Sequence, residues 1–175
     1  MIRVIITGYM GAGKTTVGKT LARELGLPFY DLDKYIEARM HRTIPEIFAE
    51  RGEEGFRKIE HNMLHEIAEF EDVIISCGGG TPCFFDNMDY INKNSTTIYL
   101  RASINVIWKH IHMGHTIRPL LQGKSDDDAI LFIQNQLKDR EIFYLRAKHI
   151  VDVGILDNSE RIKDIVLKIR EMLNL

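Results

Sequence analysis

Cysteine and proline are scarce in this sequence, which has 2 Cys and 4 Pro among its 175 residues. The two thiols, Cys77 and Cys83, are too few for a secreted scaffold held by disulfides, and their spacing matches neither a CxxC redox pair nor a zinc half-site. We therefore expect a reduced, cytoplasmic protein. Its hydrophobic residues, at 45%, suffice for a core without disulfides or a structural metal, and they exclude a disordered chain.

Net charge and long apolar runs are also nearly absent. The 23 basic and 25 acidic residues leave a formal charge of -2, so no large positive field exists to attract nucleic acid. No run near the start has the length of a signal peptide, and none approaches the ~20 apolar residues that span a bilayer. We expect a soluble protein without nucleic-acid or membrane partners, in which local cations and backbone amides hold any anionic ligand.

Short apolar runs alternate with segments of helical periodicity along the chain. Runs that are apolar on both faces are typical of parallel strands covered by helices. Helical signals lie between them, such as Thr43 followed by Glu46 in a capping box, and Ser125 followed by Asp128. No linker divides the chain, so the pattern predicts one parallel α/β sandwich. The five runs cover residues 2–7, 28–33, 73–77, 96–100 and 149–153.

A glycine-rich phosphate-binding motif follows the first run. Residues 8–15, GYMGAGKT, match G-x-x-x-x-G-K-[ST] and precede a helical pattern, so their backbone amides are expected to face phosphate oxygens at a helix N-terminus. Lys14 is expected to reach the β and γ phosphates, and Thr15 to offer its hydroxyl to Mg²⁺. Because the NKxD and DxxG sequences of GTPases are absent, the motif favours a small phosphotransferase that uses a nucleoside triphosphate.

Two carboxylates, Asp31 and Asp33, end the second run, whereas the third run ends in Cys77 and offers none. Alternate residues of an extended segment face the same side, so we expect both carboxylates beside the phosphates at the carboxyl edge of the sheet. One could hold hydrated magnesium while the other accepts a proton from an acceptor hydroxyl. A strand-end turn with Asp33 as a helix N-cap is the alternative.

Three further features suggest an acidic, compact acceptor. The glycines at 78–80 leave a wall without side chains, so a ligand can approach backbone amides closely. Arg57 lies beside a stripe of apolar residues that recur at helical spacing from Phe56 to Phe70, and Arg140 lies one turn before Tyr144. Each could bind a carboxylate with a guanidinium fork. Arg118 lies in a long loop that could close as a lid and neutralise the transferring phosphoryl group. The alternative interpretations are that the three glycines form only a sharp turn, that Arg57 and Arg140 are surface cations, and that Arg118 precedes a helix that starts at a proline.

Five elements, in order along essentially the whole chain, resemble the shikimate kinase family. They are GYMGAGKTT at 8–16, DLDKYIE at 31–37, FRKIE at 56–60, SCGGGT at 76–81, and RPLL at 118–121 followed by the pair Arg140 and Tyr144. The resemblance implies ATP-dependent phosphorylation of the 3-hydroxyl of shikimate on the way to chorismate. It also implies a usually monomeric, three-layer P-loop NTPase fold, similar to nucleoside monophosphate kinases, with a five-stranded parallel sheet of order 2-3-1-4-5.

The resemblance also implies roles for particular residues, within a single kinase domain over residues 1–175 whose substrate-binding segment covers about 33–61 and whose lid covers about 110–125. The catalytic set is Lys14, Asp33 and Arg118; the nucleotide set is Gly11, Ala12, Gly13, Lys14, Thr15, Thr16 and Arg118; the shikimate set is Asp33, Arg57, Gly79, Gly80 and Arg140; and the Mg²⁺ set is Thr15 and Asp31. Asp33 would be the base and Asp31 would contact the hydrated metal.

One departure concerns the adenine contact. Family members often carry an arginine shortly before the lid that lies against the adenine ring, and the nearest candidates here are Lys109, His110 and His112. Elsewhere, His61 and His65 lie four residues apart. They lack the glutamate of H-E-x-x-H and an evident third ligand, so the sequence does not favour a metal site there.

Two other functions are compatible with a phosphate-binding loop, and the sequence offers a test of each. The first rival is another small-molecule kinase of the same fold, acting on gluconate or on a nucleoside monophosphate. A kinase of nucleoside monophosphates would need more phosphate-binding arginines and a surface that recognises the base. A catalytically silent ATP-binding module would be expected to have lost Lys14, Asp33 or Arg118, and all three are present.

Overall fold

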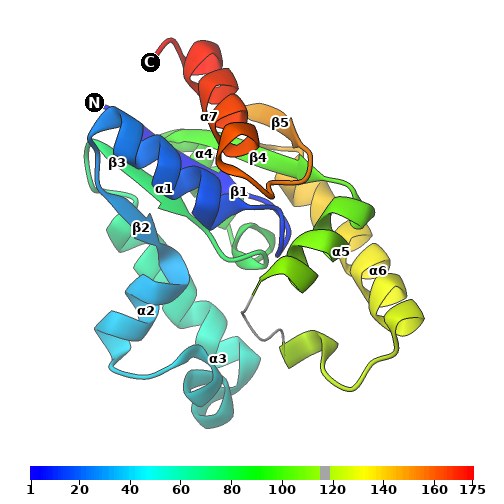
Figure 1. Cartoon of the computed structure of the whole chain (residues 1–175). Helices are drawn as coiled ribbons and strands as arrows, with labels where there is room; N and C mark the ends of the chain where they lie inside the picture. The colour runs from blue at the N-terminus through cyan, green and yellow to red at the C-terminus, as the bar shows by residue number, and fades with distance from the viewer. Residues whose placement is uncertain (115–118) are drawn as a thin grey trace.

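The computed structural model describes residues 1–114 and 119–175, and a parallel five-stranded sheet forms its centre (Figure 1). The strand order is β2-β3-β1-β4-β5, as expected from the resemblance. All strand pairs are parallel, with Ile5 of β1 opposite Ile75 of β3 and Thr97 of β4. The strands are β1 (Arg3–Thr7), β2 (Phe29–Asp31), β3 (Val73–Ser76), β4 (Thr96–Ala102) and β5 (His149–Val153).

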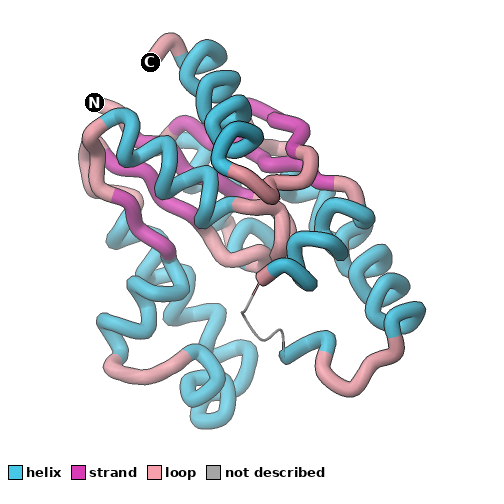
Figure 2. Tube along the Cα trace, in the orientation of Figure 1, coloured by secondary structure: helices cyan, strands magenta, loops and turns pink. Residues whose placement is uncertain are grey.

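Helices cover both faces of the sheet, which gives three layers (Figure 2). They are α1 (Lys14–Leu25), α2 (Leu32–Met40), α3 (Ile44–Ile67), α4 (Asn87–Asn94), α5 (Ile104–Met113), α6 (Asp126–Tyr144) and α7 (Ser159–Leu173), with short 3₁₀ turns at Thr81–Cys83 and Pro119–Leu121. Helices α1 and α7 lie side by side on one face (Figure 1). In the described part of the chain, no helix is both long enough and apolar enough to cross a membrane.

The buried core has two parts, one on each side of the sheet, because successive strand residues point to opposite faces. Val4 and Ile6 of β1 pack with α1 and α7, whereas Ile5 packs with Leu32 of α2 and Leu64 of α3. This arrangement explains why the strand runs are apolar on both faces, as parallel strands buried between helix layers require.

Local signals in the sequence set several helix ends. The Thr43 hydroxyl accepts from the backbone N–H of Glu46, and the Glu46 carboxylate accepts from the backbone N–H of Thr43, which confirms the predicted capping box. Ser125 caps α6 by accepting from the backbone N–H of Asp128. The prediction for residues 28–33 is partly wrong, because the strand ends at Asp31 and the next two residues begin α2.

Candidate functional site

The glycine-rich motif forms the turn between β1 and α1, and its shape depends on residues without side chains. A Cβ at Gly8, where φ is +141°, would lie 2.7 Å from the carbonyl oxygen of Leu100. Gly13 is the N-cap residue of α1, with φ 96° in the left-handed region, and it has no side chain with which to cap the amides that follow. The Lys14 ammonium donates to the carbonyl oxygens of Gly8 and Tyr9, at 2.8 and 2.9 Å. The N-terminus of α1 therefore presents backbone amides beside the Lys14 ammonium.

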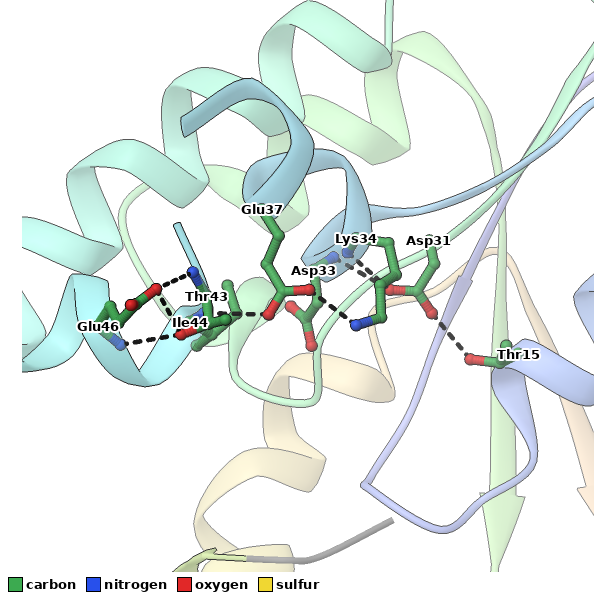
Figure 3. Close-up of polar contacts among 8 residues, drawn as sticks. All are labelled: Thr15, Asp31, Asp33, Lys34, Glu37, Thr43, Ile44 and Glu46. Carbon is green, nitrogen blue, oxygen red and sulfur yellow. Dashed lines mark hydrogen bonds and ion pairs between the residues drawn. The ribbon is translucent and has the colours of Figure 1, made fainter. Parts of the chain in front are cut away.

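The two oxygens of Asp31 perform different tasks (Figure 3). Oδ1 accepts from the backbone N–H groups of Asp33 and Lys34, at 3.1 and 3.3 Å, and so caps α2. Oδ2 accepts from the hydroxyls of Thr15 and Ser76, at 2.9 and 3.3 Å. The N-cap of α2 is therefore Asp31, and the alternative that placed Asp33 at this position is wrong.

Asp33 lies in the first turn of α2, not in the strand, so the reasoning that paired it with Asp31 on one side of an extended segment is wrong. It nevertheless faces the glycine turn. A Cβ built on Gly78 would be 3.1 Å from Oδ1 of Asp33, 3.1 Å from Oγ1 of Thr81 and 3.4 Å from Oε1 of Glu60. The acidic side chain thus comes close to the backbone after β3.

Burial and neighbouring charges change the acidity of Asp33. Removal from water raises its pKa to about 6, and the negative charges of Asp31 and Glu60 act in the same direction, while the Lys14 ammonium opposes them. A carboxylate with this pKa is partly protonated just below neutral pH and can exchange a proton near it.

Two arginines from different helices lie against the same glycine turn. Arg57 of α3 is buried, with 9% exposure, and a Cβ on Gly80 would come within 2.6 Å of its Nη2. Arg140 of α6 lies against Gly79, where Nη1 would be 3.3 Å from an added Cβ. The interpretation of Arg57 as a surface cation is therefore wrong, and Arg140 is half-buried.

The triple-glycine turn also adjoins the phosphate-binding loop. From the position where a Cβ of Gly79 would lie, the backbone nitrogen of Met10 is 3.3 Å away and the carbonyl oxygen of Gly8 is 3.6 Å away. Arg140 approaches the same position from the other direction. The structure therefore brings the two glycine-lined segments, Asp31, Asp33 and both arginines into one region.

Arg118 and residues 115–117 of the predicted lid lie outside the described residues. The described ends of that segment are α5, which ends at Met113, and the 3₁₀ turn Pro119–Leu121. The predicted role of Arg118 thus stays a prediction from the sequence.

The sequence did not indicate a role for Glu60, which is 1% exposed and forms hydrogen bonds with Arg57 and Thr81 at the site. Its Oε2 accepts from Nη1 of Arg57 at 2.8 Å, and its Oε1 accepts from the Thr81 hydroxyl at 2.6 Å. The Phe84 ring lies 4.1 Å from the Arg57 guanidinium carbon on another side. The i, i+3 spacing of Arg57 and Glu60 was the available signal, because such residues share a helix face.

His110 is a second residue whose role the sequence did not show. Its Nε2 accepts from the backbone N–H of Leu156 at 2.8 Å, so the ring proton is on Nδ1, which donates to the carbonyl oxygen of Gly11 at 2.6 Å. Among the three candidates for the adenine contact, His110 is thus engaged in holding the phosphate-binding loop to the segment after β5.

A parallel sheet with this strand order, a phosphate-binding loop after β1 and carboxylates at the carboxyl edge define a P-loop phosphotransferase. The chain belongs to the shikimate kinase family, since the family model described as "Shikimate kinase" matches residues 10–174.

Individual relatives agree with this family. A shikimate kinase from Bacteroides fragilis is 52% identical over 175 residues, which are 100% of this chain and 98% of the relative. The crystal structure of shikimate kinase from Bacteroides thetaiotaomicron matches with a TM-score of 0.97, 48% identity and 99% coverage of both chains. Shikimate kinase from Acinetobacter baumannii in complex with shikimate matches with a TM-score of 0.86 and 30% identity, covering 99% of this chain and 94% of the other.

Asp33→Asn is expected to stabilise the ligand-free protein more at about pH 8 than at about pH 4.5. Because the folded pKa, about 6, exceeds the unfolded value, folded Asp33 keeps a proton that the unfolded chain loses between roughly pH 4 and 6. The contribution of this group to stability therefore falls as pH rises through that window, and asparagine removes the loss.

The gain in unfolding free energy, measured by urea denaturation, should be about 1 to 2 kcal/mol larger at pH 8 than at pH 4.5. Asp139→Asn, at an exposed position of α6, is the matched control. An equal effect of Asp33→Asn at both pH values would contradict the assigned environment of Asp33.

Proposed function

We propose that this chain transfers the γ-phosphoryl group of ATP to the 3-hydroxyl of shikimate, which gives shikimate 3-phosphate for the synthesis of chorismate and aromatic amino acids. The observation that carries the proposal is the position of Gly79, which lies against the phosphate-binding loop at Met10 and against Arg140. A triphosphate bound by the loop and an acid bound by the arginine would meet at this glycine. Family membership and the shikimate complex of the Acinetobacter baumannii relative support the same acceptor.

The phosphate-binding loop is assigned to ATP. Backbone amides after the glycines would hold the phosphate oxygens, and the ammonium of Lys14 would move from the loop carbonyls to the γ-phosphoryl group as negative charge develops there. Arg118 is assigned as a second cation on that group. The nucleotide-binding set comprises Gly11, Ala12, Gly13, Lys14, Thr15, Thr16 and Arg118.

The side chains of Thr15 and Asp31 fit a magnesium ion. They present a hydroxyl and a carboxylate oxygen 2.9 Å apart at the N-terminus of α1, and Mg²⁺ prefers oxygen ligands, few of them from the protein. When bound, Mg²⁺ would neutralise part of the negative charge on the phosphate groups. The Asp31 oxygen that caps α2 would remain in place, so Asp31 would still fix the start of that helix.

The shikimate carboxylate is assigned to Arg57 and Arg140, which reach the glycine turn from α3 and α6. Their guanidinium forks can each donate two parallel hydrogen bonds to a carboxylate. Glu60 and the Phe84 ring hold Arg57 in this orientation, so less conformational entropy is lost on binding. The backbone of Gly79 and Gly80 would line the ring of the substrate.

Asp33 is assigned as the base. Its carboxylate lies beside Gly78 and Glu60, and the positive charge of Lys14 acts on it. This carboxylate would accept the proton of the attacking hydroxyl. Its raised pKa suits this step, because a base whose pKa lies near the working pH both stays ionised and accepts a proton readily.

We also propose that residues 1–175 act as one monomeric kinase domain in the cytoplasm, with a substrate-binding segment at about 33–61, a lid at about 110–125, and no nucleic-acid or membrane partner. The balance of 23 basic and 25 acidic residues supports the absence of a nucleic-acid partner, because it provides no strong positive field.

The acceptor is tested by measuring ADP release with shikimate, gluconate and nucleoside monophosphates offered in parallel. We expect turnover with shikimate to exceed turnover with the other acceptors by orders of magnitude, because only shikimate combines a ring hydroxyl with a carboxylate for the two arginines. Preference for gluconate would favour the rival kinase. A gluconokinase from Sinorhizobium meliloti, 14% identical with a TM-score of 0.55, shares only the fold. Absence of turnover with every acceptor would favour the silent ATP-binding module.

Arg140→Ala should weaken shikimate binding by roughly 2 to 5 kcal/mol, because it leaves a desolvated carboxylate without its partner. ATP affinity should change little, since the nucleotide is assigned to other residues. Calorimetric titration with each ligand separately measures both effects, with Lys138→Ala, at an exposed position of the same helix, as the control. Equal weakening of both ligands would show that Arg140 is not a substrate clamp.

Asp33→Asn should lower kcat by about 10² to 10⁴, because an amide cannot accept the hydroxyl proton. In the unmodified protein, kcat/KM for shikimate should rise with pH and reach half of its plateau at about 6, as Asp33 loses its proton. The pH profile of kcat/KM at saturating ATP measures this. A profile that stays flat from pH 5 to 8, or near-normal turnover of Asp33→Asn, would remove Asp33 from the role of base.

A further inference from the structure

A second group of polar side chains lies where α3 faces the start of α4. It consists of His61, His65 and Asp86, whose ligand-type atoms all lie within 4.8 Å of one another. Nδ1 of His61 is 3.8 Å, and Nε2 of His65 is 3.9 Å, from the same carboxylate oxygen of Asp86. The sequence spacing indicated only the two histidines, and the fold brings Asp86 beside them as a third possible ligand.

Two features of this cluster are unexplained by packing. Nε2 of His65 is buried and, in the described part of the chain, has no hydrogen-bond partner, a situation that costs free energy in a folded protein. Asp86 occupies the N-cap position of α4, where aspartate usually accepts from a backbone N–H, yet its side chain makes no such bond. Instead its carboxylate lies beside the two imidazoles.

The imidazoles are held in place before any ligand arrives. His65 stacks on the Tyr90 ring with centroids 3.5 Å apart, and the His61 and His65 rings are 4.2 Å apart. Asp86 is the adaptable member, because its side chain is 66% exposed. Metal bonds of about 2.0 to 2.2 Å require ligand atoms somewhat closer than the 3.9 Å between Nε2 of His65 and Asp86, and rotation of the exposed carboxylate can provide the change.

We propose that His61, His65 and Asp86 bind one divalent transition-metal ion of the Zn²⁺ class, separate from the Mg²⁺ set at Thr15 and Asp31. Two imidazole nitrogens and one carboxylate oxygen are ligands that such ions prefer, whereas Mg²⁺ prefers oxygen alone. Three protein ligands leave a position for water. The ion would join α3 to the segment before α4 and give the buried Nε2 of His65 a partner.

The cluster is also connected to buried hydrogen bonds of the protein through Asn87. Nδ1 of His61 lies 2.7 Å from Oδ1 of Asn87, a fully buried residue whose amide donates to the carbonyl oxygen of Thr81. Because the Asn87 amide nitrogen donates to Thr81, its Oδ1 accepts the proton on Nδ1 of His61, and Nε2 is the nitrogen of His61 that would bind the metal. Asn87 thus fixes the orientation of the His61 ring from the nitrogen opposite the metal, as groups behind a metal ligand commonly do. The site is therefore built on a rigid part of the fold.

Calorimetric titration with Zn²⁺, with excess Mg²⁺ present to occupy oxygen sites, tests the proposal. We expect about one ion per chain for the unmodified protein and for His112→Ala, a control at an exposed histidine of α5. His65→Ala and Asp86→Ala should each lower the affinity at least about tenfold, since each removes a ligand. Turnover with ATP and shikimate should remain normal in both variants, which checks that they fold.

A second measurement does not depend on any variant. Co²⁺ added to the unmodified protein should give visible absorption bands of an ion with nitrogen and oxygen ligands, and Zn²⁺ should abolish them by competition. The proposal is overturned if the unmodified protein binds no Zn²⁺ in the micromolar range, or if His61→Ala/His65→Ala binds Zn²⁺ as tightly as the unmodified protein does.

Discussion

The carboxylate of Asp31 joins the two halves of the site. One oxygen caps α2 and so fixes the position of Asp33, while the other accepts from Thr15 at the start of α1. The position of the proposed acceptor end of the site relative to the proposed nucleotide end therefore depends on one side chain at the carboxyl edge of the sheet. Parallel topology makes this possible, because β1, β2 and β3 all end at that edge.

Concentrated negative charge is the energetic consequence of this arrangement. Asp33 and Glu60 lie against the same glycine turn, and Asp31 is at the end of β2, two residues before Asp33. The negative charges of Asp31 and Glu60 contribute to the raised pKa of Asp33. Lys14 opposes the effect on Asp33, and Arg57 is paired with Glu60; both are cations that the proposed reaction would engage with substrates. These groups are arranged to bind the substrates, so the site is expected to be less stable when no substrate is bound.

Local patterns predicted the elements, and contacts between distant segments decided the details of the site. The apolar runs gave the five strands, and Thr43 with Glu46 gave a helix start, since these depend on neighbouring residues. Asp33 was misplaced because its pairing with Asp31 assumed an extended backbone beyond the last strand residue. The spacing of Arg57 and Glu60 could suggest the pair, but the burial of Arg57 also depends on Phe84 and Thr81, which lie far along the chain and could not be found from residues near Arg57.

A buried polar chain explains why Arg57 can be both charged and ordered. Glu60 neutralises it, Thr81 donates to Glu60, and Asn87 donates to the backbone of Thr81. Glu60, Thr81 and Asn87 have at most 1% exposure, so each bond acts in a medium where an unpaired partner would be costly. Removing one member would leave the next without its partner, and α3, the glycine turn and α4 are therefore held in one arrangement around the guanidinium.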